Sequence, residues 1–363
     1  MQTSPHSGGS GRPGSGPLLH IDARPETLGN VDPGGFILGL SVLARLIKTA
    51  RKNGFVTVQV AGGASLEPLL VGTDATLTPP DAVPPAGAAV VPATYLGEKA
   101  WLADLAARPG DATRMTFPVP PLDLAVDPDI KKAEQRLLST LIKDTDGFMS
   151  RHFARPISLR LSRILAPHSI TPNQMTVVST AIGLSAAPFF LSSSPLMQTL
   201  GSALFILHSI VDGCDGELAR LTFRESRIGG LLDFWGDNLV HVAVFAAMGL
   251  GWAMAADAVW PLYLTALAVA GTAGSAAAVY WFTLRRKDTG GPVYTSVSSG
   301  TPDRLSKHLD ALSRRDFIYL VFVLALFGKA AWFLALTAVG APVFLILVLI
   351  LAARARPGEQ RSA

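Results

Sequence analysis

The sequence predicts a mainly α-helical membrane protein, in which a polytopic bundle of six transmembrane helices follows a small α/β cytoplasmic domain. The chain of 363 residues is 49% hydrophobic and only 16% charged, with a mean hydropathy of +0.37, which is too apolar for a soluble protein of this length. The second half contains apolar stretches long enough to cross a bilayer. Basic residues gather at one end of these stretches, as in membrane proteins with a defined orientation.

Residues 1–32 are rich in Gly, Pro and Ser and show no sustained periodicity, so we expect a disordered tail. They contain no continuous apolar segment of the signal-peptide type. The N-terminus is therefore expected to stay on the side of synthesis.

Residues 33–125 are expected to form the small α/β domain. Apolar residues from 38 to 50 recur with helical spacing, and the apolar run 56–60 predicts a buried strand. Residues 96–107 are a second candidate helix, and the runs 88–91 and 115–119 are candidate strands. Helices and strands alternate along this segment, which is typical of an α/β fold.

Residues 126–170 are expected to form amphipathic and juxtamembrane helices. Residues 127–144 have apolar side chains on one helical face and charged side chains elsewhere. Residues 148–165 carry four arginines among apolar residues, which is typical of a helix lying in the headgroup layer. Residues 143–147 between them are a candidate hinge.

Residues 171–356 are expected to form the membrane domain. It opens at Thr171-Pro172-Asn173, where Thr can cap a helix and Pro can occupy its first turn. The last apolar run, 317–353, is nearly twice the length needed to cross a bilayer, so it must turn back. Gly328-Lys329 is the favoured turn, and residues 340–342 are the alternative. The six predicted spans are 175–191, 196–221, 228–256, 259–284, 315–331 and 332–353.

The basic residues define the orientation. The loops at one membrane face contain most of the Arg and Lys of the second half, whereas the opposite loops offer residues 192–195, Asp257 and Lys329. The positive-inside rule makes the basic face cytoplasmic, and both termini then lie there. We expect a multi-pass protein of the cell (inner) membrane. The net charge of +4 then matches anionic lipid headgroups, and we expect no nucleic-acid partner.

Two acidic stripes lie where the second predicted span meets the third. If residues 211–221 are helical, positions i, i+3, i+4 and i+7 share one face and are Asp212, Asp215, Gly216 and Ala219. Positions i, i+4 and i+8 of the next span are Gly229, Asp233 and Asp237. A polar turn at 222–226 would bring the stripes together, with Gly216 and Gly229 allowing close approach of the two backbones.

The expected pocket of four carboxylates needs a compensating ligand, because one charge at the bilayer centre costs roughly 2.5–3.5 kcal/mol. Divalent cations suit such a set of oxygen ligands. One alternative is a structural cluster neutralised by Arg220, Arg224 and Arg227. Another is a cation transporter, since intramembrane acids also mark ion paths. The chain has no second copy of the stripes, although transporters commonly show paired halves.

The pattern Asp212-x2-Asp215-Gly216-x2-Ala219-Arg220-x8-Gly229-x3-Asp233-x3-Asp237 resembles, at every position, the signature of the class I CDP-alcohol phosphatidyltransferase family. The Thr-Pro-Asn element also resembles this family. The resemblance implies a transferase of phospholipid biosynthesis, which moves a substituted phosphate from a CDP-linked donor to an acceptor hydroxyl and releases CMP. Donors in the family are CDP-diacylglycerol or a CDP-linked alcohol. The wording of the motif favours inositol phosphate or a related alcohol as acceptor.

The resemblance also implies roles for individual residues. Asp212, Asp215 and Asp233 are expected to bind Mg²⁺ or Mn²⁺, as two ions, and Asp237 is a further ligand or the general base. Independently of the resemblance, Arg285, Arg286, Arg314 and Arg315 lie at cytoplasmic helix ends, so they are candidates for binding an acceptor phosphate or are ordinary positive-inside charges. The polar loop 287–313 is a candidate flap. The expected CDP-binding residues are Asp212, Gly216, Ala219, Arg220 and Gly229.

The α/β domain loosely resembles the nucleotidyltransferase-like domain that precedes the membrane domain in some members of the family. An active domain of this type would open with a Gly-rich loop carrying a basic residue, which cradles a triphosphate. The sequence contains no such loop before Leu38. We therefore expect a degenerate domain with a structural or regulatory role.

Other polar residues near the motif have weaker assignments. Asn173 and Glu217 are candidates for lining the nucleotide site, and Asp316 for pairing with the neighbouring arginines. His208 and His241 are expected to pack or to form hydrogen bonds. The single cysteine, Cys214, is expected to be a small packing residue. We also expect a homodimer.

Overall fold

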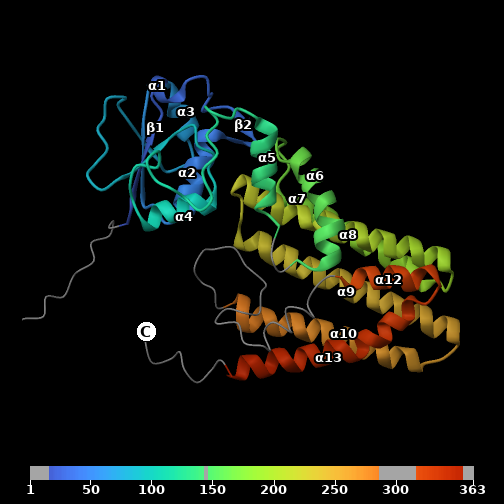
Figure 1. Ribbon diagram of the computed structural model, residues 1–363. Helices are drawn as coiled ribbons and strands as arrows, with labels where there is room; N and C mark the ends of the chain where they lie inside the picture. The colour runs from blue at the N-terminus through green and yellow to red at the C-terminus, as the bar shows by residue number, and fades with distance from the viewer. Residues whose placement is uncertain (1–15, 143–145, 286–315, 355–363) are drawn as a thin grey trace, which may run out of the picture. The chain divides into compact units, whose positions relative to one another are not determined.

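The computed structural model describes residues 16–142, 146–285 and 316–354. The chain divides into two compact units, Met1–Ser139 and Thr140–Ala363. The first is an α/β unit and the second is helical (Figure 1). The described secondary structure is thus mainly helical, as the sequence predicted.

A four-stranded parallel sheet organises the first unit. Its strands are ordered β5 (Thr76–Thr78), β4 (Thr57–Ala61), β1 (Leu18–Asp22) and β6 (Ala89–Pro92). Leu19 of β1 pairs in register with Val58 and with Ala89, so β1 is bonded on both edges. A short hairpin of β2 (Phe36–Ile37) and β3 (Leu40–Ser41) lies outside this sheet.

The position of β1 corrects one expectation from the sequence. Residues 18–22 were expected to lie in a disordered tail, yet they form a central strand whose Leu19 and Ile21 are completely buried. This strand is a short apolar run beside a segment rich in Gly, Pro and Ser, so the local composition hides it. Its stability comes from pairing with strands almost 40 and 70 residues further along the chain.

The helices of the first unit largely follow the predicted pattern. They are α1 (Pro25–Leu28), α2 (Val42–Lys52), α3 (Glu67–Leu70), α4 (Lys99–Ala107) and α5 (Ile130–Ser139), with a 3₁₀ turn at Ala64–Leu66. The Ser41 hydroxyl accepts a hydrogen bond from Ala44 N and starts α2 later than predicted. The predicted strand at 115–119 is wrong, because this segment is a loop that inserts Phe117 against Trp101 in the core.

Helix α5 belongs to the first unit, whereas the sequence grouped residues 126–170 as juxtamembrane helices. Its buried residues include Leu137 and Leu138. Arg136 Nε lies 2.6 Å from Glu98 Oε1, and Glu98 is buried. Burial raises the pKa of Glu98, and Arg136 offsets part of that shift. This ion pair and the apolar contacts tie α5 to the α/β unit.

The second unit contains the predicted spans. Five segments are long and apolar enough to cross a membrane: Pro172–Leu191, Pro195–Thr222, Arg227–Ala256, Trp260–Phe282 and Ala330–Ile350. The sixth, α12 (Phe317–Leu326), has ten residues and a length of about 15 Å, short of a bilayer core. Five candidate spans therefore match the prediction, and α12 is shorter than its predicted span.

The helices of this unit are α6 (Arg155–Leu165), α7 (Pro172–Ala186), α8 (Pro195–Thr222), α9 (Arg227–Ala256), α10 (Trp260–Val279), α12 and α13 (Ala330–Arg354). Short π-helical segments lie at Ser150–Ala154 and Tyr280–Leu284, and a 3₁₀ segment lies at Ala187–Leu191. The long helices α9, α10 and α13 run side by side (Figure 1). Thr171 and Gln174 form the capping box that starts α7.

The turn between α12 and α13 lies at Gly328-Lys329, as the sequence favoured. Gly328 has φ +66°, a conformation that suits glycine. The alternative at 340–342 is wrong, because Pro342 lies inside α13. At this position α13 packs closely on α10, and a Cβ at Gly271 would approach the Pro342 ring to 2.7 Å.

Candidate active site

The two motif helices are joined by a short turn, as the sequence predicted. Helix α8 ends at Thr222, and Phe223 follows in the left-handed conformation with φ 56°. The Ser226 hydroxyl then accepts a hydrogen bond of 3.0 Å from Gly229 N and caps α9. Helix α7 packs against both α8 and α9.

The expected close approach of the α8 and α9 backbones at the motif glycines is not found. A Cβ at Gly216 would meet only Arg220 of its own helix, at 3.4 Å. A Cβ at Gly229 would lie 2.8 Å from Asn173 Oδ1, at the start of α7. Gly229 therefore leaves room for Asn173, and Gly216 leaves room beside the Arg220 guanidinium.

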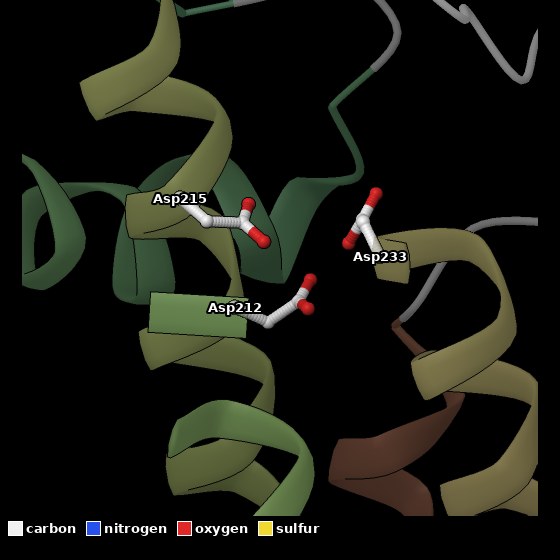
Figure 2. Close-up of side chains that lie close together, drawn as sticks. All are labelled: Asp212, Asp215 and Asp233. Carbon is white, nitrogen blue, oxygen red and sulfur yellow. The ribbon is translucent and has the colours of Figure 1, made fainter. Parts of the chain in front are cut away.

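Three of the four motif acids, Asp212, Asp215 and Asp233, come together, and we call them the carboxylate cluster. Asp212 and Asp215 project from α8 toward Asp233 on α9 (Figure 2). One carboxylate oxygen from each lies within 4.8 Å of the others. Asp212 and Asp215 are buried, and Asp233 is half-buried. The i, i+3 spacing puts the first two on one face of α8, and the turn brings the third opposite them.

Two hydroxyl groups of α7 contact the carboxylate cluster. Thr176 Oγ1 donates a hydrogen bond to Asp215 Oδ2, and Ser179 Oγ lies 3.5 Å from Asp212 Oδ1. Both α7 residues are buried. The sequence analysis missed them, although hydroxyl residues at i and i+3 inside an apolar span are a recognisable pattern. Such contacts orient ligand carboxylates.

Asp237 lies outside the group of three carboxylates. Its Oδ1 is 3.5 Å from His208 Nε2. The other ring nitrogen, Nδ1, lies 2.8 Å from Ser179 O, and a carbonyl oxygen only accepts, so Nδ1 carries a proton. The hydrogen-bonding role expected for His208 is confirmed. His241 packs among aromatic rings, with the Phe317 ring 5.5 Å away.

Glu217 faces away from the carboxylate cluster, so its expected place in the nucleotide site is wrong. It is completely buried against α6 and accepts hydrogen bonds from Arg155, Ser158 and Ser162. The physical reason is helical geometry, since two residues beyond Asp215 correspond to a rotation of about 200° around α8. Cys214, on the same side, is buried with Sγ 3.5 Å from Ser158 O, as a packing residue would be.

Of the other residues that the sequence predicted for the site, only some lie in the part of the chain that the structure describes. The Arg285 guanidinium stacks over the Trp281 ring at 4.1 Å. Arg286, Arg314, Arg315 and the candidate flap lie outside the described residues. The Asp316 carboxylate accepts a hydrogen bond of 3.3 Å from Ser150 N and fills the space beside Gly147, while its expected partners among the arginines are not described.

The carboxylate cluster fits a hard divalent cation. Its donors are all oxygens, supplied by three acids at mutual distances that a single ion could bridge. The two α7 hydroxyls complete an oxygen-rich surrounding in an otherwise apolar bundle. The fold and the site thus define a helical membrane protein with an acidic centre suited to divalent metal ions.

Residues 169–302 match the family model described as CDP-alcohol phosphatidyltransferase. This part of the chain therefore matches the CDP-alcohol phosphatidyltransferase family, as the motif resemblance predicted. The match includes α8, α9 and all four motif acids.

Several characterised relatives are similar to the chain over part of its length. A bifunctional IPC transferase and DIPP synthase of Thermococcus kodakarensis is 41% identical over 146 residues, which are 40% of this chain and 32% of the relative. An archaetidylinositol phosphate synthase of Pyrococcus horikoshii is 34% identical over 25% of this chain and 47% of the relative. A CDP-diacylglycerol–serine O-phosphatidyltransferase of Mycobacterium tuberculosis is 36% identical over 23% of this chain and 31% of the relative.

The chain spans about a third to a half of the length of these relatives. Among solved structures, the apo phosphatidylinositol phosphate synthase of Mycobacterium tuberculosis aligns with 54% of this chain and 95% of its own, at 19% identity and a TM-score of 0.33. So weak a likeness carries no argument about the site.

Proposed function

We propose that the protein transfers a substituted phosphate from a CDP-linked donor to an acceptor hydroxyl and releases CMP. The observation that carries this proposal is the convergence of Asp212, Asp215 and Asp233 within the matched family domain. The names of the relatives support inositol phosphate or a related alcohol as acceptor, in phospholipid or polar-lipid synthesis. The donor is CDP-diacylglycerol or another CDP-linked alcohol.

Asp212, Asp215 and Asp233 would hold Mg²⁺ or Mn²⁺, and we propose a pair of ions. Bound divalent ions neutralise the diphosphate of the donor and stabilise the leaving phosphate. Thr176 fixes the direction of the Asp215 carboxylate, and the Ser179 hydroxyl lies 3.5 Å from Asp212 Oδ1. The CDP part would be received by the space beside Gly216 and the Arg220 guanidinium, with Ala219 and Gly229 as further proposed contacts.

In the proposed reaction the acceptor hydroxyl oxygen attacks the phosphorus that carries the donor's alcohol. The bond from this phosphorus to the bridging oxygen breaks, and CMP leaves with the bonding electrons. Asp237 accepts the hydroxyl proton, because it lies outside the carboxylate cluster yet only one helical turn from Asp233. His208 Nε2 lies 3.5 Å from Asp237 Oδ1, beside the proposed base. Arg285, Arg286, Arg314 and Arg315 would bind the acceptor phosphate.

We propose that the α/β unit does not activate CTP. Its β1 leads into Ala23-Arg24-Pro25 and α1, where an active nucleotidyltransferase would need a Gly-rich phosphate loop. The basic residue in this segment, Arg24, is bound by Asp22 at 2.8 Å and 2.6 Å, and Thr27 donates to the same carboxylate. A triphosphate would therefore have to compete with an internal ion pair. The full chain should release no pyrophosphate from CTP with any polyol phosphate, and such release would make the protein bifunctional.

We further propose that the protein is a homodimer in the cell (inner) membrane, with the carboxylate cluster and both termini on the cytoplasmic side. The basic residues at the site end of α8 and α9, including Arg220, Arg224 and Arg227, support this orientation. The donor and the metal ions would then reach the site from the cytoplasm.

CMP release by the purified protein tests the proposal. Donors of both kinds are offered with a panel of acceptor alcohols, first with Mg²⁺ or Mn²⁺ and then with excess EDTA. We expect release with at least one donor and acceptor pair, complete loss in EDTA and recovery when the metal is restored. Release that continues in excess EDTA would contradict the metal site. No release with any pair, from a protein that binds Mn²⁺, would favour the cation-transporter alternative.

A further inference from the structure

A second buried polar cluster lies on the side of α8 that faces away from the carboxylate cluster. We call it the Arg155 cluster, and its members are Asp146, Arg155, Ser158, Ser162 and Glu217. Arg155 donates to both Asp146 oxygens at 3.0 Å and to Glu217 at 2.7 Å. Glu217 also accepts from Ser158 at 2.7 Å and from Ser162 at 2.6 Å. Every oxygen of Glu217 therefore has a defined partner.

The surfaces of α6 and α8 fit each other around this cluster. Ser158 and Ser162 are one turn apart on α6 and face Glu217. On α8, a Cβ at Gly213 would lie 3.5 Å from Arg155 Nη1 and 3.7 Å from Ser158 Oγ, which is ordinary contact distance, so α6 packs directly on this face of α8. The next residue, Cys214, is completely buried beside Ser158 O. Gly213 and Cys214 thus lie at the surface of α8 that contacts α6.

Helical geometry connects this interface to the carboxylates. Glu217 is two residues from Asp215, so the two side chains point to opposite sides of α8. A side-chain carboxylate about 5 Å from the helix axis moves about 1 Å when the helix rotates by about 10°. Metal ligands tolerate deviations of only about 0.2–0.5 Å. The site therefore depends on a precise rotation of α8.

We propose that Arg155 and Glu217 are positioning residues, which fix the rotation of α8 so that Asp212 and Asp215 meet Asp233. This inference rests on the proposed function, because it concerns the same metal site. The hydrogen bonds of the cluster are directional, and a rotation of α8 would break all of those to Glu217 together. An apolar interface between α6 and α8 would allow small rotations at little cost, because hydrophobic contacts are non-directional.

Stability alone gives a weak reason for such a cluster. Replacing a buried ion pair completely by apolar residues is often neutral or stabilising, whereas removing one partner leaves a buried charge and is strongly destabilising. A complete replacement of the charges can therefore separate the two roles. It should leave the fold intact and still disturb the metal site.

The test uses the full chain in detergent and measures free Mn²⁺ by electron paramagnetic resonance, with the melting temperature recorded in parallel. The main variant is Asp146→Asn/Arg155→Met/Glu217→Met, which leaves no unpaired charge. The second is Arg155→Lys, which keeps the charge but cannot bind both carboxylates with a planar fork. The control is Gln198→Met, which removes a buried residue at the other end of α8 that bonds Ser192 O and Ala330 N.

We expect the triple variant to lose about 10–100-fold in Mn²⁺ affinity with a melting temperature near that of the wild type. Arg155→Lys should lose affinity in the same direction, and it decides the outcome if the triple variant does not fold. Gln198→Met should bind Mn²⁺ like the wild type even if it melts earlier. Wild-type affinity in the folded charge variants would overturn the inference alone. A wild-type protein that binds no Mn²⁺ would overturn the proposed metal site and the inference with it.

Discussion

The acidic side chains of the α/β unit and of the helical unit have different kinds of neighbours. In the α/β unit Asp22 is held by Arg24, and Glu98 is held by Arg136. In the helical unit Asp212, Asp215 and Asp233 approach one another, and hydroxyl groups of α7 contact two of them. Glu217 shows that the same helix can also carry an acid bound by an arginine.

This difference separates acids that stabilise a fold from acids that can bind a ligand. An acid bound by an adjacent arginine has its charge compensated inside the protein, so it attracts cations weakly. Three carboxylates within 4.8 Å concentrate negative charge at one point, which a divalent cation compensates. In the α/β unit the Arg24 guanidinium is bound by the Asp22 carboxylate. In the helical unit three carboxylates lie close together instead.

The largest effect is expected from the carboxylates. Asp212→Asn, Asp215→Asn and Asp233→Asn should each lower the rate of CMP release by about a thousandfold or more, because an amide is a neutral and weaker metal ligand. The loss corresponds to about 4 kcal/mol of transition-state stabilisation. The variants should still insert and purify.

Cys214→Ala is the control for these substitutions, because Cys214 lies on α8 but faces α6. It should keep most of the activity and lose about 1 kcal/mol of stability. A Cys214→Ala protein as inactive as Asp215→Asn would contradict the separation of the two sides of α8.

A smaller effect is expected from the α7 hydroxyl that orients Asp215. Thr176→Val keeps the shape of the side chain and removes its hydrogen bond, so the Mg²⁺ concentration needed for half-maximal CMP release should rise about 10–100-fold. Ser185→Ala removes a hydroxyl of the same helix that bonds Ile182 O, and it should not change the Mg²⁺ requirement. Equal Mg²⁺ requirements in the two variants would mean that Thr176 does not orient the ligand.

Two glycines distinguish substrate space from helix packing. Gly216→Ala places a methyl group where the nearest protein atom is Arg220 Nη1 at 3.4 Å, so the fold should keep its stability or gain up to about 1 kcal/mol. The Michaelis constant for the CDP-linked donor should rise if the donor occupies this space. Gly183→Ala would press a methyl group to 2.6 Å from Val240 and should destabilise the bundle by about 1–3 kcal/mol. Thermal unfolding and donor titrations of both variants check this pair, and an unchanged Michaelis constant in Gly216→Ala would remove CDP from this position.

The smallest effect is expected in the α/β unit. Burial would raise the pKa of Asp22, but hydrogen bonds from Arg24 and Thr27 outweigh it and lower the pKa. A lowered pKa in the folded state contributes stability above the unfolded value, and this contribution disappears as the pH falls through the folded value. Asp22→Asn should therefore cost less than about 1 kcal/mol at neutral pH, and the cost should vanish well below pH 4. Chemical unfolding at several pH values measures it, while CMP release should not change.

The placement of β1 also decides how the α/β unit can be studied. A fragment of residues 30–125 would omit the central strand Leu18–Asp22 and the helix α5. A fragment with a chance of folding has to begin before Leu18 and to include Ser139.

The sequence alone determined the features that depend on neighbouring residues. Hydropathy located five candidate spans within a few residues, and Gly328 marked the turn between α12 and α13. The spacing of Asp212, Asp215 and Asp233 predicted their convergence, because helical periodicity and a short turn are local properties.

Only the tertiary structure decided which groups from distant segments meet. It made residues 18–22 a central strand, turned Glu217 toward Arg155, left Asp237 beside His208 and brought the Thr176 hydroxyl to Asp215. These partners lie 29 to 70 positions apart in the sequence. Periodicity along one segment says which residues share a face, but the packing of whole helices and strands determines what that face touches.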